Sequence, residues 1–326
     1  MPRSLPLVLA LLLSSSTLHA DEGVLDKFRD LFQREGTHVE LDAVPDFLQR
    51  VFVPTVPEVE NTFRVHGTTI DAIVDAPRGF HCERRDGMLV INAPQGEVAG
   101  YVTVRMGQRE LTLTVVNLIP YSRMRAGLLE GYRIGEYALL PLRGLRSYER
   151  PKGFMRLNAS NRDLWVSDHY RLRDFQCKLD GSTSGHSPAT KFLVLRTEAL
   201  VKLELLQHIL ETRHGAHFRR FVIMSGYRTP YYNAMIGNDT SHSRHLYGDA
   251  MDIYIDENRD GVMDDVNRDG RVDSEDARFL LQVAEAIDKS QQWGWLKGGA
   301  GVYHANRARG PYLHVDARGY VARWGV

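Results

Sequence analysis

The 326-residue sequence carries no excess of charge of either sign, because its 41 lysines and arginines balance its 41 aspartates and glutamates. Proteins that bind nucleic acid or acidic membrane surfaces through their overall field usually have a basic excess. The overall charge therefore gives no reason to expect nucleic acid or an acidic membrane surface as a partner.

The sequence also lacks an apolar run of the ~20 residues that a membrane helix needs. The run near the N-terminus extends only from Leu5 to Leu13. It follows Arg3 and leads into small residues that end at Ala20, an order typical of a secretory signal. We expect residues 1–20 to be a cleaved signal peptide and the protein to be exported, to the periplasm or the extracellular space; an uncleaved anchor is the weaker alternative.

Cysteine is scarce, with only Cys82 and Cys177 in the chain. Neither directly follows the N-terminal apolar run, so no residue there offers a site for a lipid anchor. An exported protein can form disulfides, and a bond between these two cysteines would join two predicted domains. Two separate buried thiols are the alternative, because the sequence does not tell whether the Cα atoms lie within the ~7 Å that a disulfide requires.

The segment from about Glu58 to Pro120 contains short runs rich in Val, Ile, Thr and Tyr, with Gly or Asp between them. This pattern predicts a small antiparallel sandwich, and we expect residues 21–120 to form an all-β, sandwich-like domain. It has no cluster of His, Cys or acidic residues at ligand spacing, so we assign no chemistry to it. The predicted strands are Thr69–Val74, Met88–Asn92, Tyr101–Met106 and Glu110–Val116.

The rest of the chain divides into an irregular connector, residues 121–165, and an α+β domain, residues 166–326. An amphipathic helix is expected over Lys191–His214, where apolar residues recur every three or four positions and Gly215 ends the pattern. A second helix is expected over Ser274–Asp288, capped by Asp273 or Ser274. The predicted strands are Phe221–Met224, Asp249–Ile255 and Tyr312–Ala317.

Three residues of the C-terminal half have the chemistry of a zinc site. His245 stands seven residues before Asp252, and Gly248 between them lets the backbone turn. Further along the chain, Tyr312, His314 and Asp316 share one face of a predicted strand, because side chains alternate. Two imidazoles and one carboxylate suit Zn²⁺ and leave a fourth position free, as in catalytic sites. We predict His245, Asp252 and His314 as the ligands.

Two motifs in this half resemble the zinc D-Ala-D-Ala carboxypeptidase and murein endopeptidase family, also called the peptidase M15 group. Residues 243–252 fit its S-x-H-x-x-G-x-A-x-D signature, and Ser225–Arg228 resembles its S-G-Y-R element. The sequence is most similar to the branch whose last ligand lies in an H-V-D strand. The resemblance implies one catalytic zinc and hydrolysis of peptide bonds in bacterial peptidoglycan, in a stem or a cross-link that contains D-amino acids, by a carboxypeptidase or an endopeptidase.

The resemblance also implies roles for residues around the metal. Arg228 would approach a substrate carboxylate or the polarised carbonyl, and we assign Ser243 and Tyr312 to substrate binding as well. Many members carry a general-base glutamate three residues before the last histidine, where this chain has Pro311. We therefore expect Asp316 as the base, or His304 as second candidate. Asp316 could instead only orient His314 through a hydrogen bond.

An acidic insert follows the Asp252 strand over residues 256–276, with nine acidic and three basic side chains. Its spacing resembles overlapping calcium loops of the dockerin or thrombospondin type, with Gly261 and Gly270 at turn positions. We expect one or two structural Ca²⁺ ions there; a solvated acidic loop is the alternative. The predicted ligands are Asp256, Asn258, Asp260, Asp264, Asp265, Asn267, Asp269, Asp273 and Asp276.

Two other functions remain open from the sequence. The missing glutamate at Pro311 would fit a non-catalytic cell-wall-binding protein that keeps its zinc. A calcium-stabilised adhesion or scaffold protein, in which the β domain carries the function, is the other alternative.

Overall fold

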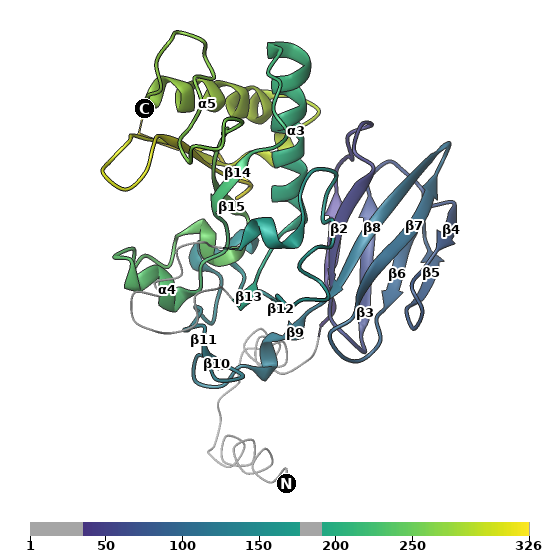
Figure 1. The fold of residues 1–326 in the computed structure, drawn as a ribbon. Helices are drawn as coiled ribbons and strands as arrows, with labels where there is room; N and C mark the ends of the chain where they lie inside the picture. Colours follow the sequence, from purple (N-terminus) through teal and green to yellow (C-terminus); the bar gives the residue numbers. More distant parts are fainter. Residues whose placement is uncertain (1–34, 177–190, 326) are drawn as a thin grey trace. The chain divides into compact units, whose positions relative to one another are not determined.

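The N-terminal region of the computed structural model consists mostly of β-strands, which form two four-stranded sheets (Figure 1). The structure describes residues 35–176 and 191–325. One sheet has the order β1-β3-β6-β5 and the other the order β2-β8-β7-β4. The strands are β1 (His38–Leu41), β2 (Arg50–Thr55), β3 (Glu60–Val65), β4 (Ala72–Asp75), β5 (His81–Arg85), β6 (Met88–Asn92), β7 (Ala99–Met106) and β8 (Arg109–Asn117).

The predicted strands of this region are found, with small shifts at their ends. β6 coincides with its prediction, β7 and β8 extend theirs by one or two residues, and β4 begins later than the predicted Thr69. Asp86 and Gly87 connect β5 to β6 with φ angles of 50° and 76°. A tight hairpin turn of type I′ requires positive φ at both of its central residues, which explains the Asp-Gly pair.

The two sheets are mixed, so the prediction of a purely antiparallel arrangement was wrong. β1 runs parallel to β3, and β2 runs parallel to β8. Parallel neighbours need long connections, and the strands from β3 to β7 supply one between β2 and β8. The sequence pattern of each strand carries no information about this pairing. A sandwich arrangement of the two sheets stays a prediction.

Several predictions concern residues or boundaries that the structure does not test. The predicted signal peptide, residues 1–20, and Cys177 lie outside the described residues. Cys82 is half-buried on β5, and its desolvation raises the pKa of the thiol to about 11.

From Gly36 onward the chain forms one compact unit, and the predicted boundaries at residues 120 and 165 stay predictions. In the described part of the chain, no helix is long and apolar enough to cross a membrane.

The predicted connector is irregular, with short strands and single 3₁₀ turns. One strand pair is β10 (Leu128–Leu129) with β11 (Tyr132–Arg133). A small sheet follows, with the order β13-β12-β9, from β9 (Ile119–Pro120), β12 (Gly153–Arg156) and β13 (Phe192–Leu193). The 3₁₀ turns of the connector are η1 (Tyr121–Arg123), η2 (Leu142–Gly144) and η3 (Arg146–Tyr148), and η4 (Leu172–Phe175) lies beyond it.

The long helix α3 (Thr197–His214) is buried on nearly all sides. It ends at Gly215, as predicted, with a φ of 61° that glycine tolerates best. The predicted start at Lys191 was wrong, because Phe192–Leu193 pair with β12 as a strand. The predicted amphipathic character was also wrong: α3 packs against both β2 and α5 (Ser274–Lys289), and its buried polar residue Lys202 pairs with Asp288 of α5.

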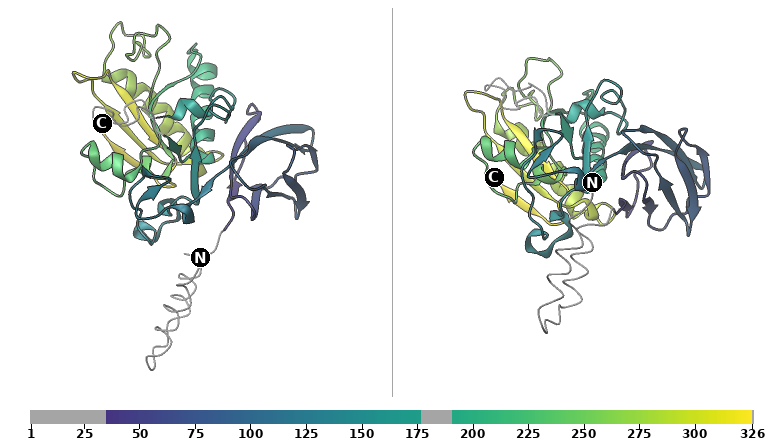
Figure 2. Two further views of the ribbon diagram at one scale, coloured as in Figure 1. Left: turned by 60° about the horizontal axis from the view of Figure 1, so that its bottom comes forward. Right: turned by 90° about the horizontal axis from the view of Figure 1, so that it is seen from below.

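A five-stranded sheet forms the C-terminal part, with the order β14-β15-β17-β16-β18 (Figures 1 and 2). The strands are β14 (Val222–Ser225), β15 (Ala250–Tyr254), β16 (Gly299–Tyr303), β17 (Tyr312–Asp316) and β18 (Ala322–Trp324). β14, β15 and β17 were predicted, as was α5, which packs on β16 and β17 and is capped by Asp273. Shorter elements are α4 (Pro230–Met235), η6 (Arg244–Tyr247) and η7 (Gly294–Leu296).

An ion pair between His169 and Glu204 ties the start of the C-terminal half to α3, with Nδ1 and Oε2 2.6 Å apart. The hydrogen bond that His169 donates to Glu204 raises the pKa of His169 above its usual 6.5, against the opposing effect of desolvation. Because the pKa is higher in the folded state, the stabilisation is complete below about pH 6.5 and is lost as the pH rises through the folded pKa.

We therefore expect His169→Gln to lower the free energy of unfolding more at pH 5.5 than at pH 9. The difference should stay below ~1 kcal/mol, because the His169 side chain is 42% exposed and solvent screens the pair. Urea unfolding of both proteins at the two pH values measures it. A larger effect of the substitution at pH 9 would contradict the prediction.

Candidate metal centre

His245 lies on a short 3₁₀ turn that leads directly into a strand of the five-stranded sheet. The turn η6 ends at Gly248, which has a φ of 74°. A Cβ atom at this position would lie 2.5 Å from the carbonyl oxygen of Val194, so only glycine fits. The chain then enters β15, which carries Asp252. We call residues 243–248 the histidine turn.

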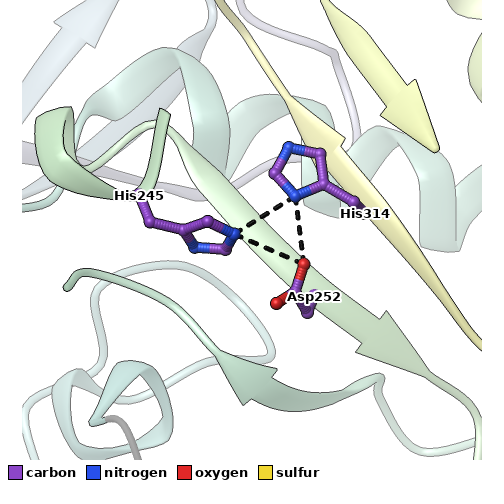
Figure 3. Close-up of side chains that lie close together, drawn as sticks. All are labelled: His245, Asp252 and His314. Atoms are coloured by element: carbon purple, nitrogen blue, oxygen red, sulfur yellow. Dashed lines mark hydrogen bonds and ion pairs between the residues drawn. The ribbon is translucent and has the colours of Figure 1, made fainter. Parts of the chain in front are cut away.

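Asp252 and His314 stand directly opposite each other on the neighbouring strands β15 and β17. Their side chains point toward His245, and the three residues form a compact triangle (Figure 3). Oδ1 of Asp252 lies 3.0 Å from Nδ1 of His314 and 3.4 Å from Nε2 of His245. Nε2 of His245 lies 3.2 Å from Nδ1 of His314. All three predicted zinc ligands therefore converge, in a site that is buried.

Hydrogen bonds outside the triangle determine which ring nitrogens face inward as acceptors. Nδ1 of His245 lies 2.7 Å from the carbonyl oxygen of Gly226, which can only accept, so this nitrogen carries the proton. Nε2 of His314 lies 3.1 Å from the carboxylate of Asp316. The inward nitrogens of both rings then present lone pairs beside the Asp252 carboxylate. Three acceptors without a shared proton repel one another, and a bound cation removes that repulsion.

The pKa shifts of His245 and Asp252 also fit residues that hold a cation. Desolvation lowers the pKa of His314, but its hydrogen bonds with Asp252 and Asp316 outweigh this and raise it. Burial lowers the pKa of His245, which keeps the imidazole neutral and available as a ligand. Burial alone would raise the pKa of Asp252, but its interactions with His245 and His314 outweigh this and hold it well below the usual value. Both groups are therefore in the protonation state that a divalent metal requires.

Arg228 contacts the same carboxylate from the other side. Its Nη2 donates to Oδ2 of Asp252 at 2.6 Å, and its Nε donates to the hydroxyl of Ser225 at 2.8 Å. Its backbone N–H donates to the carbonyl oxygen of His245 at 3.1 Å. Residues 225–228, which we call the arginine turn, are thus bonded to both Asp252 and the histidine turn. The Arg228 side chain is 12% exposed, and the guanidinium borders the site.

Asp316 is fully buried and lies behind His314, next to the ring nitrogen that faces away from the triangle. It accepts hydrogen bonds from the backbone N–H of Gly299 at 2.7 Å and from the guanidinium of Arg318. Burial would raise its pKa, but the bonds from His314 and Arg318 outweigh this and lower it strongly. This position favours the orienting role over the role of general base.

The other residues predicted from the sequence have different surroundings. The Tyr312 ring stacks on the Tyr303 ring at 4.6 Å, and burial together with the charge of Asp252 raises its pKa. Ser243 is half-buried at the start of the histidine turn, where its carbonyl oxygen accepts from Leu246. His304 is exposed just beyond β16 and does not belong to the metal-binding group.

Trp324 of β18 is a neighbour of the centre that the sequence did not reveal. Its ring lies 5.0 Å from the His314 ring, and its Nε1 donates to the hydroxyl of Tyr303 at 3.0 Å. A Cβ atom at Gly301 would lie 2.1 Å from this Nε1, and one at Gly299 would lie 2.4 Å from Oδ2 of Asp316. The glycines of β16 are the sequence feature that could have indicated these contacts, because they leave room for the side chains of Trp324 and Asp316 against the sheet.

The acidic insert forms two loops with the same hydrogen bonds. Asp256 accepts from the N–H groups of Asp260 and Gly261, and Asp265 accepts from those of Asp269 and Gly270. Gly261 and Gly270 both have a φ of 84°. Within the described ranges, however, no three carboxylates of the insert converge as the three groups of the metal centre do. The structure therefore gives no support for calcium, which stays a prediction.

The sequence of residues 168–274 matches the family model of Peptidase M15. This range contains the arginine turn, His245 and Asp252, whereas His314 lies beyond it and joins them through the pairing of β15 with β17. No curated protein and no solved structure matches the chain.

Proposed function

Residues 168–274 form a Peptidase M15 family domain, and we propose that the chain is a zinc peptidase that hydrolyses peptide bonds in bacterial peptidoglycan. The family implies metallopeptidase activity and a peptide substrate. We propose further that the bond lies in a stem or cross-link that contains D-amino acids, and that the protein works after export. The observation that carries the proposal is the convergence of His245, Asp252 and His314.

Zinc suits this donor set of two imidazoles and one carboxylate, and when bound it polarises a carbonyl oxygen and lowers the pKa of water. Asp252 and the two histidines would hold it. Arg228 then provides a fixed positive charge beside the site, available to a substrate carboxylate or to the negative charge that develops on the reacting oxygen. Asp316 holds His314 in the orientation and tautomer that a ligand needs.

The proton acceptor is then His304, the second candidate from the sequence. His304 follows Tyr303 directly, and the Tyr303 ring stacks on Tyr312. We assign Tyr312 to the substrate side of the site, together with Ser243 at the start of the histidine turn.

The experiment that tests the function is digestion of purified peptidoglycan with the zinc-loaded protein, followed by analysis of the released fragments. We expect cleaved stem peptides or cross-links with zinc, and none after chelation. Product masses distinguish a carboxypeptidase from an endopeptidase. Binding to peptidoglycan without any cleavage would support the non-catalytic wall-binding alternative, and neither binding nor cleavage would leave the adhesion or scaffold alternative.

We also propose that the acidic insert binds calcium. Its two loops share one hydrogen-bond pattern, and Asp264 has a pKa raised by burial and by the charges of Asp256 and Asp260. Like charges so close together are relieved by a cation, and oxygen ligands prefer Ca²⁺ to zinc. Because the insert begins four residues after Asp252, ordered loops would also stabilise the strand that carries this ligand.

With zinc held saturating, calcium should raise the melting temperature of the wild-type protein. A ligand that binds only the folded state adds ~2.7 kcal/mol at a hundredfold excess over its Kd. The double substitution Asp260→Ala with Asp269→Ala should remove the calcium-dependent shift, whereas Glu275→Ala, an acidic residue outside the predicted ligand set, should keep it. A calcium-free wild-type protein whose melting temperature stays constant up to millimolar calcium would refute calcium binding.

A further inference from the structure

The connector, residues 121–165, lies outside the matched range 168–274 but contacts both turns of the metal centre. The hydroxyl of Tyr137 lies 2.9 Å from the hydroxyl of Tyr227 in the arginine turn. The same hydroxyl lies 2.9 Å from the carbonyl oxygen of Leu246, the residue after His245. One side chain of the connector therefore bridges the two turns.

The direction of these hydrogen bonds follows from the groups involved. The carbonyl oxygen of Leu246 can only accept, so Tyr137 uses its single O–H to donate to it. The hydroxyl of Tyr227 must then donate to the oxygen of Tyr137. Desolvation raises the pKa of Tyr137 well above 10, so the hydroxyl keeps its proton. The result is a directed chain from the arginine turn through the connector to the histidine turn.

A second contact fixes the residues on either side of His245. The guanidinium of Arg244 donates to the carbonyl oxygen of Ser147 at 2.6 Å and lies 4.4 Å from the centre of the Tyr148 ring. The Tyr148 ring also packs perpendicular to the Tyr247 ring at 5.3 Å. Residues 244, 246 and 247 are thus each held by the connector.

The turns that Tyr137 joins are the ones that orient the ligands. Gly226 beside Tyr227 accepts the hydrogen bond that fixes the His245 ring, and Arg228 on its other side is bonded to Asp252. A shift of one turn against the other would change the separation of the inward nitrogen of His245 from the Asp252 carboxylate. Hydrogen-bond partners behind metal ligands typically change metal affinity by about 10- to 100-fold when removed.

We infer that Tyr137 is a positioning residue of the metal centre, which sets the affinity for zinc by joining the arginine turn to the histidine turn. This inference rests on the proposed zinc site, and it makes the connector part of the centre. The hydroxyl is the effective group, whereas the ring packs against Tyr121 and Phe154 independently of it.

The test compares Tyr137→Phe with Tyr170→Phe in the full chain. Tyr170 is a matched control because its buried hydroxyl also makes two hydrogen bonds, to Gln207 at 2.9 Å and from the Phe221 N–H at 3.1 Å, and both partners lie outside the two turns. The zinc Kd is measured by competition with a chromophoric chelator, and the absorption spectrum of the cobalt-loaded protein reports the ligand geometry. Thermal melting measures the stability of both variants.

We expect Tyr137→Phe to weaken zinc binding about tenfold and to alter the cobalt spectrum, while Tyr170→Phe keeps the wild-type Kd and spectrum. Wild-type zinc affinity and an unchanged cobalt spectrum in Tyr137→Phe would overturn the inference, as would equal losses in the two variants. A wild-type protein that binds no zinc would refute the proposed function itself. Zinc binding without hydrolysis would refute only the enzymatic activity and would leave this inference standing.

Discussion

Replacing His314 with alanine should remove zinc from the protein and abolish hydrolysis. His314 supplies one of three converging ligand atoms and is buried, with 5% of its surface exposed, so its removal leaves two of the three protein ligands. His245→Ala and Asp252→Ala should have the same effect. Removing a residue that only hydrogen-bonds to a ligand raises the metal Kd by at most ~100-fold. We expect a larger rise here, because a ligand itself is lost.

Metal analysis after gel filtration, together with digestion of peptidoglycan, measures this result. His217→Ala is the matched control, since His217 is exposed and outside the cluster, and this variant should keep one zinc per chain. Full zinc occupancy in any of the three ligand variants would remove that residue from the ligand set.

Asp316→Asn should have the second largest effect, on both stability and zinc affinity. The carboxylate accepts from Arg318 and Gly299 and faces His314, and it is fully buried. An amide leaves the Arg318 charge without its partner, and removing one partner of a buried pair costs ~3–5 kcal/mol. We expect a value near the lower end, because the Arg318 side chain remains 13% exposed. Zinc affinity should fall about 10- to 100-fold, because the His314 ring loses the carboxylate that fixes its orientation.

Turnover at saturating zinc distinguishes the two roles considered for Asp316. If Asp316 orients His314, excess zinc restores most of the hydrolysis, whereas loss of a general base leaves turnover reduced at least ~100-fold. Asp288→Asn is the control, because Asp288 is also buried and pairs with Lys202 and Arg323 without touching a ligand side chain. It should lower stability while zinc affinity stays close to the wild-type value. Turnover that remains low at full zinc occupancy would assign the base to Asp316.

The sequence predicted the elements with strong local patterns. The Asp-Gly turn before β6, the capped start of α5 and the glycine end of α3 follow from backbone preferences of single residues. The convergence of His245 with Asp252 was predicted from the glycine-containing turn that enters a strand, and His314 was added because a second imidazole in an H-V-D strand suits a zinc site. The pairing of β15 with β17 that brings His314 to the site could not be read from the sequence.

Features that depend on pairing between distant segments were not predicted. The parallel neighbours β1 and β3 have no local signature, and the helical pattern before Thr197 was overridden because Phe192 pairs with β12. The place of Asp316 behind His314 was one of two open alternatives, since alternation along a strand gives the face of a side chain and not its partner. Trp324 reaches His314 only because β18 pairs with β16.

The most direct test of the central claim, that zinc held by His245, Asp252 and His314 drives peptide hydrolysis, is a zinc titration of the metal-free protein with peptidoglycan as substrate. Release of stem peptides or cross-link fragments should rise in proportion to added zinc and reach its plateau at one zinc per chain. In the His314→Ala protein the same titration should give no release. Hydrolysis by the metal-free wild-type protein, or equal hydrolysis by His314→Ala, would contradict the account.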